Sequence, residues 1–465
     1  MPLIGQSEKD RDVVAVATKP LTGDTRSGNA APVLIRGGRV IDPANGIDGV
    51  MDVLLVDGKV AEVRQGLDIP AGGRTIDADG LVVAPGLVDL HTHLREPGFE
   101  YKETIESGTR AAAAGGYTTL CCMPNTEPAL DTAAAVEFVR RTAKATGYVR
   151  VYPIGAITKG RKGKQLAEMA ELAEAGAVAF SDDGDCVENS AMMRSALEYS
   201  LIVRRPIVQH AEDKALTAGA QMNEGPVAAR LGLKGWPRQG EEVIVARDVL
   251  LAELTGAHLH VAHLSTAGSI EYVRRAKQRG LRVTAEATPH HLTLTDDLVA
   301  GHWWSATASL APYDASTKVN PPLRTNEDSA ALVAALNDGT IDCVATDHAP
   351  HGVSDKHCEY ALAASGISNI ETALGQLLSV VHAGKMGLAE MVATMTSRPA
   401  AVFGLPAGTL SAGATADVVI FDPEREWCVD PQQMFSKGKN TPLAGHFLRG
   451  QALFTLVGGE VVHEH

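Results

Sequence analysis

Two histidines, His91 and His93, stand at the end of an apolar run, residues 81–90, that predicts a buried strand. Residues i and i+2 of a strand project to the same face, so both imidazoles could bind one metal ion. The pattern is weak alone, because chance predicts about one His-x-His in every second chain of this composition. Two more pairs, His258/His260 and His463/His465, do occur. His91 and His93 therefore gain meaning only if other segments supply further ligands.

Four later apolar runs also end in side chains that could do chemistry, namely Phe180–Gly184, Val208–Asp213, Leu259–Ser265 and Cys343–His351. A lone histidine or aspartate in such a place more often caps a helix or satisfies a core hydrogen bond. Five strand ends that carry carboxylates and imidazoles would, however, all face one mouth of a barrel, where barrel active sites lie. Because so many buried polar groups need partners, a metal site is the economical interpretation.

The middle of the chain alternates short apolar strands with alanine-rich amphipathic stretches, and this alternation predicts parallel strands with crossover helices. About eight such units indicate a closed (β/α)8 barrel, a TIM-like α/β fold, rather than an open sheet. The expected helices cover 104–114, 131–145, 165–175, 241–255 and 268–279. The expected strands after residue 100 are 117–123, 150–157, 177–181, 206–210, 258–263, 282–287 and 341–346.

The two chain ends have a different pattern, with short alternating segments separated by glycines, which is typical of β-hairpins. Neither end has enough strands for a good sheet alone, so we expect residues 31–84 and 401–465 to form one small β-sandwich domain together. Residues 85–400 would then make the barrel. Residues 1–30 are mixed polar and are interpreted as a flexible N-terminal extension.

The bulk composition limits the partners. The 465 residues carry a formal net charge of −14, which argues against a nucleic acid or an anionic membrane. It does not exclude an anionic substrate, because a metal can reverse the sign of the charge locally. The six cysteines lack Cys-x-x-Cys spacing, which indicates reduced thiols in a cytoplasmic protein. No apolar run reaches membrane-spanning length, and no signal-peptide pattern opens the chain.

The order and content of the motifs identify a family resemblance. From about residue 33 to the C-terminus the chain resembles the dihydroorotases of the amidohydrolase superfamily, and among them the bacterial type I enzymes. The motifs that carry the likeness are V-x-P-G-L-V-D-L-H-x-H-L-R-E-P-G, F-S-D-D-G, H-A-E-D, H-L-S-T, T-P-H-H-L, N-P-P-L-R and D-C-V-A-T-D-H-A-P-H.

The resemblance implies two Zn²⁺ ions per chain, bridged by Asp183 and a hydroxide. Many relatives use a carboxylated lysine as the bridge, but residues 180–184 contain no lysine. Adjacent strand residues face opposite ways, so Asp182 and Asp183 cannot both face the metals, and only the family match favours Asp183. The ligands it implies are His91, His93 and Asp347 for the first metal, and His210 and His263 for the second.

The resemblance also assigns roles in the reaction. Asp347 would be the general acid/base, taking a proton from the attacking water and passing it to the departing ring nitrogen. Arg95, two residues after His93, would bind the substrate carboxylate through its planar guanidinium. The complete set of implied substrate contacts is His93, Arg95, Asn125, Asn320, His351, Ser365 and Gly366. His290 and His291 match a family motif too, either as direct contacts or as structural residues.

Two segments depart from the family pattern. The family's Pro-Phe-Gly loop appears here as Ala364-Ser365-Gly366, which removes an aromatic wall from the expected substrate pocket. Residues 301–312 make a longer connection than expected, interpreted as a lid, an interface element or a plain insertion. Both departures bear on substrate preference.

The expected activity is the reversible cyclisation of N-carbamoyl-L-aspartate to dihydroorotate in pyrimidine synthesis. One alternative is a hydantoinase or allantoinase, which performs the same chemistry on another ring. Arg95 and Asn125 favour a carboxylated ring. The other alternative is a non-catalytic subunit that supports aspartate transcarbamoylase, or a chain active only when bound to it. A small-molecule substrate and a homo-oligomer are expected.

Overall fold

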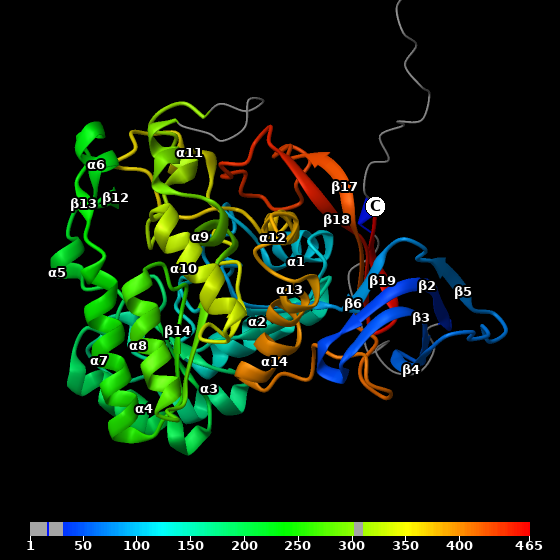
Figure 1. Cartoon of the computed structure of the whole chain (residues 1–465). Helices are drawn as coiled ribbons and strands as arrows, with labels where there is room; N and C mark the ends of the chain where they lie inside the picture. Colours follow the sequence, from blue (N-terminus) through cyan, green and yellow to red (C-terminus); the bar gives the residue numbers. More distant parts are fainter. Residues whose placement is uncertain (1–15, 18–30, 302–309) are drawn as a thin grey trace, which may run out of the picture.

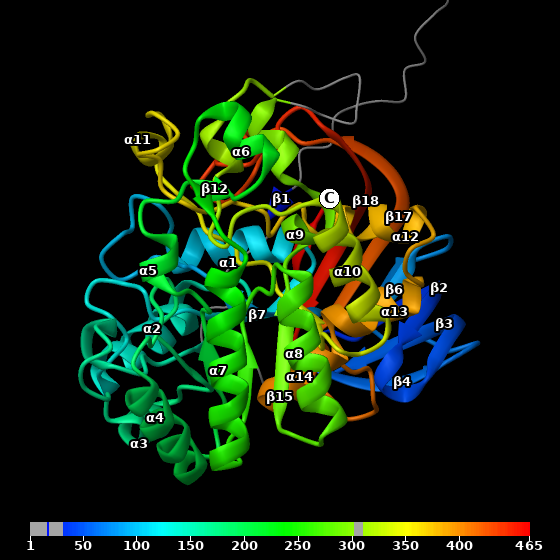
Figure 2. The same cartoon turned by 60° about the vertical axis from the view of Figure 1, so that its left-hand side comes forward.

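The computed structural model describes residues 16–17, 31–301 and 310–465. A helix-covered barrel and a β-sheet lie side by side (Figure 1), and Figure 2 shows the barrel helices α7 and α8 standing next to each other. Of the predicted N-terminal extension, only β1 (Val16–Ala17) is described, paired with the last strand of the sheet. Within the segment 301–312, residues 302–309 lie outside the described residues, so its three interpretations stay open.

Eight parallel strands form the barrel. They pair as one set of three and one set of five, and parallel bridges between Gly155 and Phe180 and between Thr92 and His348 join the two sets into a closed ring. The predicted barrel is therefore confirmed. The strands in ring order are β7 (Leu87–Thr92), β8 (Tyr117–Cys122), β9 (Arg150–Pro153), β10 (Phe180–Ser181), β11 (Ile207–Gln209), β14 (Leu259–Val261), β15 (Val283–Ala287) and β16 (Cys343–Val344).

Helices surround the barrel because each has one apolar face to bury. Threonine N-caps begin several of them; Thr104, Thr132, Thr266 and Thr325 each accept a hydrogen bond from the backbone three residues on. The longer helices are α1 (Ile105–Ala114), α2 (Ala133–Thr146), α3 (Met169–Ala175), α4 (Ser190–Val203), α7 (Gln239–Thr255), α8 (Ala267–Gln278), α10 (Asn326–Asn337), α12 (Ala373–His382), α13 (Leu388–Met395) and α14 (Ser397–Phe403).

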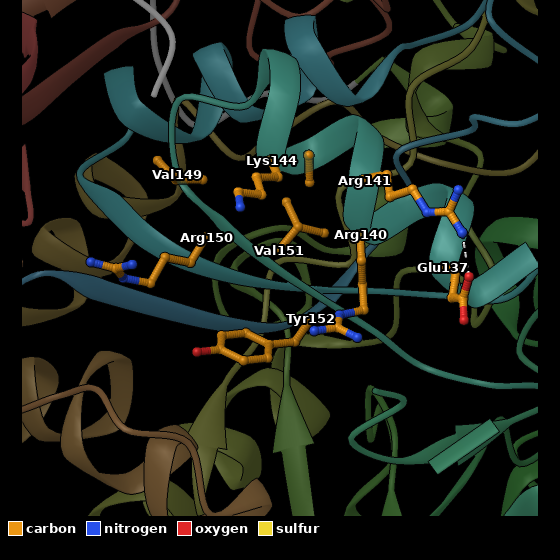
Figure 3. Close-up of a pocket in the computed structure, with 9 residues that line it drawn as sticks. Glu137, Arg140, Arg141, Lys144, Val149, Arg150, Val151 and Tyr152 are labelled. Atoms are coloured by element: carbon orange, nitrogen blue, oxygen red, sulfur yellow. Dashed lines mark hydrogen bonds and ion pairs between the residues drawn. The ribbon is translucent and has the colours of Figure 1, made fainter. Parts of the chain in front are cut away.

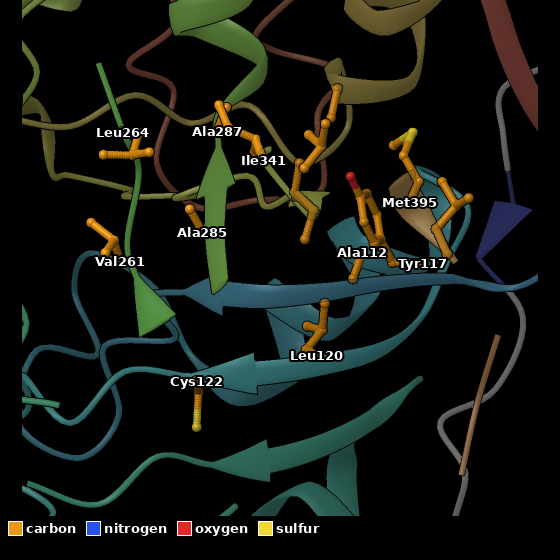
Figure 4. Packing of buried hydrophobic residues seen from close by; sticks show 14 of the residues in the cluster. Ala112, Tyr117, Leu120, Cys122, Val261, Leu264, Ala285, Ala287, Ile341 and Met395 are labelled. Carbon is orange, nitrogen blue, oxygen red and sulfur yellow. The ribbon is translucent and has the colours of Figure 1, made fainter. Parts of the chain in front are cut away.

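Shorter elements occupy the loops at the carboxyl ends of the barrel strands. They are α5 (Lys214–Thr217), β12 (Met222–Asn223), α6 (Pro226–Leu231), β13 (Gly235–Trp236), α9 (Pro289–Thr293) and α11 (Val353–Lys356). The layer between strands and helices is a single apolar core. Figure 4 shows part of it, where Leu120 of β8, Val261 of β14 and Ala285 of β15 belong to the same buried cluster.

Both chain ends build one nine-stranded sheet that includes β1. Its strands are β2 (Val33–Asp42), β3 (Ile47–Val56), β4 (Lys59–Arg64), β5 (Arg74–Asp77), β6 (Val82–Pro85), β17 (Val418–Cys428), β18 (Phe447–Val457) and β19 (Glu460–Glu464). Alternate residues of β17 point to opposite faces of the sheet and pack in two different hydrophobic cores. Val418 and Ile420 pack within the sheet's own cluster, while Val419 and Phe421 pack in the barrel core, so the sheet is buried against the barrel.

The apolar run before His91 belongs to both parts of the fold. Residues 82–85 form β6, between β17 and β2 of the sheet, and residues 87–92 form β7 of the barrel. Gly86 joins them where a Cβ would lie 2.1 Å from the Thr118 side chain, so only glycine fits. The single predicted strand is thus two strands, which fix the segment that carries His91 and His93 between two cores.

The structure also describes the lengths of the helices and the state of the cysteine thiols. No helix of the described residues is long and apolar enough to span a membrane. All six cysteines are free; Cys358 and Cys428 are exposed and the other four are buried.

Candidate metal centre and active site

The predicted first ligands meet at the carboxyl end of β7. His91 and His93 both project from this end, and their Nε2 atoms lie 3.5 Å and 2.9 Å from Oδ1 of Asp347, which follows β16. All three side chains are buried. Strand β7 adjoins the segment after β16 across the closed barrel, which explains how residues more than 250 positions apart come together.

Asp183 lies at the centre of four imidazoles. Its Oδ1 is 3.4 Å from His91 Nε2 and 3.5 Å from both His210 Nδ1 and His263 Nε2, and its Oδ2 is 3.6 Å from His93 Nε2. The carboxylate is therefore within reach of all four imidazoles, with three of them nearest Oδ1 and His93 nearest Oδ2. This is the arrangement expected of a bridging ligand between two ions.

Asp182 points the other way. It accepts hydrogen bonds from the backbone N–H groups of Ile157 and Thr158, both at 2.9 Å, and from the Thr158 hydroxyl. These bonds anchor the end of β10 to the loop after β9. The side chains of the two adjacent aspartates thus point in opposite directions, and that of Asp183 points toward the histidines.

The chemistry of this cluster fits metal ions. His91 Nε2 and Asp183 Oδ1 are buried and have no hydrogen-bond partner among the described residues, although buried polar atoms are normally satisfied. His91, His93 and Asp183 form one group whose ligand atoms lie within 4.8 Å of one another, and Asp183, His210 and His263 form a second. Nitrogen and carboxylate oxygen are the donors that Zn²⁺ accepts.

The electrostatics of the cluster agree with this interpretation. Burial raises the pKa of the Asp183 carboxyl, but the charge of His91 and the close imidazoles of His210 and His263 outweigh it and hold the pKa well below its usual range. Burial also opposes the charged form of His91, but Asp183, Glu286 and Asp347 raise its pKa well above the ordinary value. The pocket of carboxylates therefore attracts positive charge, which metal ions would supply.

Two buried glutamates, which the sequence analysis did not assign, hold the outer nitrogens of the histidines. Glu286 Oε1 accepts from His91 Nδ1 at 2.7 Å, and its Oε2 accepts from His260 Nε2 at 3.0 Å. Glu212 Oε2 accepts from His210 Nε2 at 3.2 Å. Such bonds fix the tautomer and direct the other ring nitrogen toward the metal. The sequence signals for them were an acidic residue inside a predicted buried strand, for Glu286, and an acidic residue two positions after a predicted ligand, for Glu212.

The backbone at three of these positions has left-handed geometry. Arg95, His263 and Asp347 have φ values of 62°, 32° and 47°, a region that residues other than glycine seldom occupy. Each residue lies just after a barrel strand, where the chain turns sharply. Such backbone strain clusters at functional sites and persists where surrounding structure enforces it.

A cavity of about 200 Å³ opens beside the histidines. Its walls contain all the predicted substrate-contact residues, which follow four barrel strands, β7, β8, β15 and β16, so the fold brings the complete predicted set together. They are His93, Arg95, Asn125, Asn320, His351, Ser365 and Gly366. Asn125 also accepts a hydrogen bond from His93 Nδ1 at 2.9 Å, so it orients this histidine as well as lining the cavity.

Arg95 provides the cavity with a buried cation. Its Nε donates to the Pro350 carbonyl at 3.2 Å, and one terminal nitrogen lies 3.4 Å from His351 Nε2. Burial lowers the pKa of Arg95 to about 10, so it stays charged at neutral pH. Burial and the charge of Arg95 lower the pKa of His351 to about 2, which keeps this imidazole neutral.

Residues 364–366 stand where the family has an aromatic residue, and hydrogen bonds to their backbone carbonyls hold this loop in place. His351 Nε2 donates to the Ser365 carbonyl at 2.8 Å, and Asn440 donates to the Gly366 carbonyl at 2.9 Å. Gly366 has φ 145°, and a Cβ there would lie 2.7 Å from the Ala349 carbonyl oxygen. Only glycine therefore allows this close approach beside the cavity.

The family-motif histidines after β15 support the site from outside. His290 Nδ1 lies 3.0 Å from Asn369 Nδ2, and His291 Nε2 donates to the Pro321 carbonyl at 3.0 Å. Neither is among the residues that line the cavity. The structure therefore favours the structural interpretation for both.

A larger cavity of about 410 Å³ lies elsewhere, between α2 and the start of β9 (Figure 3). Its charged groups are largely paired with each other or with the sheet: Arg141 with Glu137, and Arg150 with Asp417. It lies at the amino ends of the barrel strands, whereas barrel active sites lie at the carboxyl ends. The histidine cavity is therefore the candidate active site despite its smaller volume.

The barrel with histidines and aspartates converging at its carboxyl end defines the class of amidohydrolase-type, metal-dependent hydrolases. Among solved structures, L-hydantoinase (dihydropyrimidinase) from Arthrobacter aurescens matches with a TM-score of 0.82 and 28% identity, over 93% of this chain and 96% of that one. A D-hydantoinase matches with a TM-score of 0.77 and 25% identity, over 92% of this chain and 94% of that one.

Curated sequences make the assignment narrower. The dihydroorotase of Anaeromyxobacter dehalogenans is 52% identical over 93% of this chain and 98% of its own length. That of Syntrophus aciditrophicus is 49% identical over 93% of this chain and 99% of its own. The family model described as "Dihydro-orotase-like" matches residues 80–269. The chain belongs to the dihydroorotase family.

Proposed function

We propose that this protein is a dihydroorotase, which interconverts N-carbamoyl-L-aspartate and dihydroorotate in pyrimidine biosynthesis. The observation that carries the proposal is the placement of a buried arginine in the same cavity as the histidine–aspartate cluster. The cluster supports cyclic-amide hydrolysis, and Arg95 supports a ring that bears a carboxylate. The identity to curated dihydroorotases, about 50%, supports the same substrate over a hydantoin.

We propose two Zn²⁺ ions as the cofactor, because Asp183 belongs to two groups of potential ligands, one with His91 and His93 and one with His210 and His263. His91, His93 and Asp347 would hold one ion, His210 and His263 the other, and Asp183 would bridge them. When bound, the ions supply a Lewis acid for the amide carbonyl and lower the pKa of the attacking water. The remaining steps belong to the protein side chains.

Asp347 is proposed to move the proton. Its Oδ1 lies 2.9 Å from His93 Nε2 at the cavity wall, within reach of a ring amide held there. Burial raises its pKa, but His91 and His93 outweigh this and lower the pKa of Asp347. The carboxylate is therefore ready to accept the proton of water and to return it to the departing ring nitrogen.

Arg95, Asn125 and His351 are proposed to hold the ring. The guanidinium takes the ring carboxylate, while the neutral His351 and Asn125 fix its position without further charge. The Ser365 and Gly366 backbone would close the side from which the aromatic wall is missing. Because these residues come from separate barrel loops, they would exclude water once the ring is bound.

One measurement tests this function: metal content per chain, together with rates on dihydroorotate, hydantoin and allantoin. We expect about two zinc ions and turnover of dihydroorotate well above that of the uncarboxylated rings. A preference for hydantoin or allantoin would replace the proposal by the hydantoinase-type activity. Bound zinc without turnover, restored by added aspartate transcarbamoylase, would show a chain that is active only in a complex.

A homo-oligomer in the cytoplasm is also proposed. Large apolar side chains are exposed on two adjacent barrel helices, with Ile202 on α4 and Leu250 and Leu254 on α7, each more than 60% exposed. Exposed apolar groups that gather in this way often mark contacts between proteins. Sedimentation of the isolated chain would test this proposal, and a monomer at micromolar concentration would contradict it.

A further inference from the structure

Glu212 is buried between the proposed second metal ligands and the substrate cavity. It lies two residues after His210 and is 9% exposed. Its Oε2 accepts two hydrogen bonds, from His210 Nε2 at 3.2 Å and from Asn320 Nδ2 at 3.0 Å. Its Oε1 accepts a third, from the Thr217 hydroxyl at 2.5 Å. One carboxylate thus contacts both a metal ligand and a residue of the cavity wall.

An ionised carboxylate only accepts hydrogen bonds, so it determines what its partners present elsewhere. His210 must carry a proton on Nε2, which leaves Nδ1 as the acceptor that lies 2.8 Å from His263 Nε2 and 3.5 Å from Asp183 Oδ1. Asn320 must turn its Nδ2 toward Glu212, which leaves its Oδ1 for the other side. That Oδ1 is buried and has no partner among the described residues, while Asn320 lines the cavity.

We infer that Glu212 is a positioning residue that sets the tautomer of His210 and the amide orientation of Asn320 together. Asn320 then offers the cavity a hydrogen-bond acceptor rather than a donor. The complementary group is an N–H of the ring, which a cyclic amide or ureide provides. The inference has two parts. The orientation of Asn320 toward a substrate N–H rests on the proposed function, whereas the tautomer of His210 rests on the proposed metal site alone.

The key variant is Glu212→Met, which keeps approximate size and removes both acceptors. We expect the KM for dihydroorotate to rise about tenfold, because a buried acceptor is no longer directed at the ring. We expect zinc affinity, measured by competition with a chromophoric chelator, to fall 10–100-fold. Glu212→Gln should recover most of both, since its Oε1 can accept from His210 and Asn320 while its Nε2 donates to Thr217.

A double-mutant cycle separates positioning from packing. In an Asn320→Ala background, Glu212→Met should raise KM no further, yet should still weaken zinc binding. Thr217→Val is the matched control: it removes only the bond to Oε1, so KM and zinc affinity should stay within about twofold. Additive effects of Glu212→Met and Asn320→Ala on KM, or an unchanged zinc affinity, would overturn the inference.

If Glu212→Met does not fold, the variant Asn320→Asp tests the inference instead. Asn320→Asp keeps an oxygen at this position but loses the N–H that donates to Glu212. It also places a second carboxylate against that of Glu212, so the KM of this variant should rise at least as much as that of Asn320→Ala. A near-normal KM in Asn320→Asp would overturn the inference. If the unmutated chain does not turn over dihydroorotate, the proposed function fails by itself, while zinc competition with Glu212→Met and its control Thr217→Val still tests the His210 part.

Discussion

The Nδ1 atom of His91 lies 2.7 Å from Oε1 of Glu286, and both side chains are fully buried. The same glutamate accepts from His260 at 3.0 Å, so it ties β7 to β14 beneath the proposed metal centre. The pair gives a structural reason why the ligands are proposed from one His-x-His motif, His91/His93, and not from another, His258/His260. His91 and His93 face the carboxylate cluster at the barrel mouth, whereas His260 is used to hold Glu286.

Glu286→Gln should weaken zinc binding about tenfold. The amide oxygen can still accept from His91, but the negative charge that increases the basicity of the imidazole is lost. Zinc affinity by competition with a chromophoric chelator is the measurement. Glu371→Gln is the matched control, since Glu371 is a partly buried carboxylate bonded to the backbone of Phe435 and Ser436. Equal zinc affinity in the two variants would contradict the role given to Glu286.

Metal removal should destabilise the folded chain. Four histidines and two aspartates converge on the site, so zinc that binds only the folded state adds about 4 kcal/mol at a free concentration 1,000 times Kd. Exhaustive dialysis against a chelator should therefore lower Tm by several degrees, and added zinc should restore it. The variant His91→Ala/His210→Ala should show a much smaller response. A Tm independent of chelator in the unmutated chain would argue against bound metal.

Asp347→Asn should keep the fold but lose 10²–10⁴-fold in kcat, the usual range for removal of a general acid/base. Melting curves would check the fold, and metal analysis would separate loss of the base from loss of an ion. Near-normal turnover in the zinc-loaded variant would remove the proton-transfer role from Asp347.

Arg95→Ala should raise the KM for dihydroorotate about 10–100-fold, because a charge-assisted contact to the carboxylate is lost. Rates on hydantoin, which has no carboxylate, provide the internal control and should change little. Arg95→Lys should recover only part of the affinity, since an ammonium cannot make the two parallel bonds of a guanidinium. An unchanged KM for dihydroorotate in Arg95→Ala would favour a hydantoin-like substrate.

The stability of the chain should depend on pH through Glu371. Burial raises the pKa of this carboxyl from 4.5 to about 7, against backbone hydrogen bonds and the charge of Lys439 that lower it, and Glu103 adds to the rise. The folded chain therefore binds this proton more tightly than the unfolded chain does. The free energy of unfolding should fall by up to about 3 kcal/mol as pH rises from 4.5 through 7.

Glu371→Gln should remove this part of the pH dependence. Urea unfolding of both chains between pH 4.5 and 8 would measure it, and the difference in stability between them should shift in favour of the variant as pH rises. Parallel curves for the two chains would contradict the raised pKa. The comparison is made between variants because other groups titrate in the same range.

The barrel and its strand-end residues could be predicted from the sequence because their signals are local. Apolar runs of strand length separated by amphipathic stretches predict parallel strands, and the residues that end them must then share one mouth. His91, His210, His263 and Asp347 follow from this rule. The helices α4, α10 and α12 to α14 were not singled out. Neither α10 nor α12 has a narrow apolar stripe, because α10 carries exposed alanines at 330 and 334 and every residue of α12 from 373 to 378 is buried.

The tertiary structure decided what local pattern could not. The division of residues 82–92 between two sheets depends on β17, more than 300 residues away, because sheet pairing requires a partner strand. The choice of Asp183 over Asp182 depends on the loop after β9, which offers two backbone N–H groups to one side only. The roles of Glu212 and Glu286 depend on which donors surround each carboxylate. Residue types and spacing determined which groups could do chemistry; the closed barrel determined which atoms of those groups face each other.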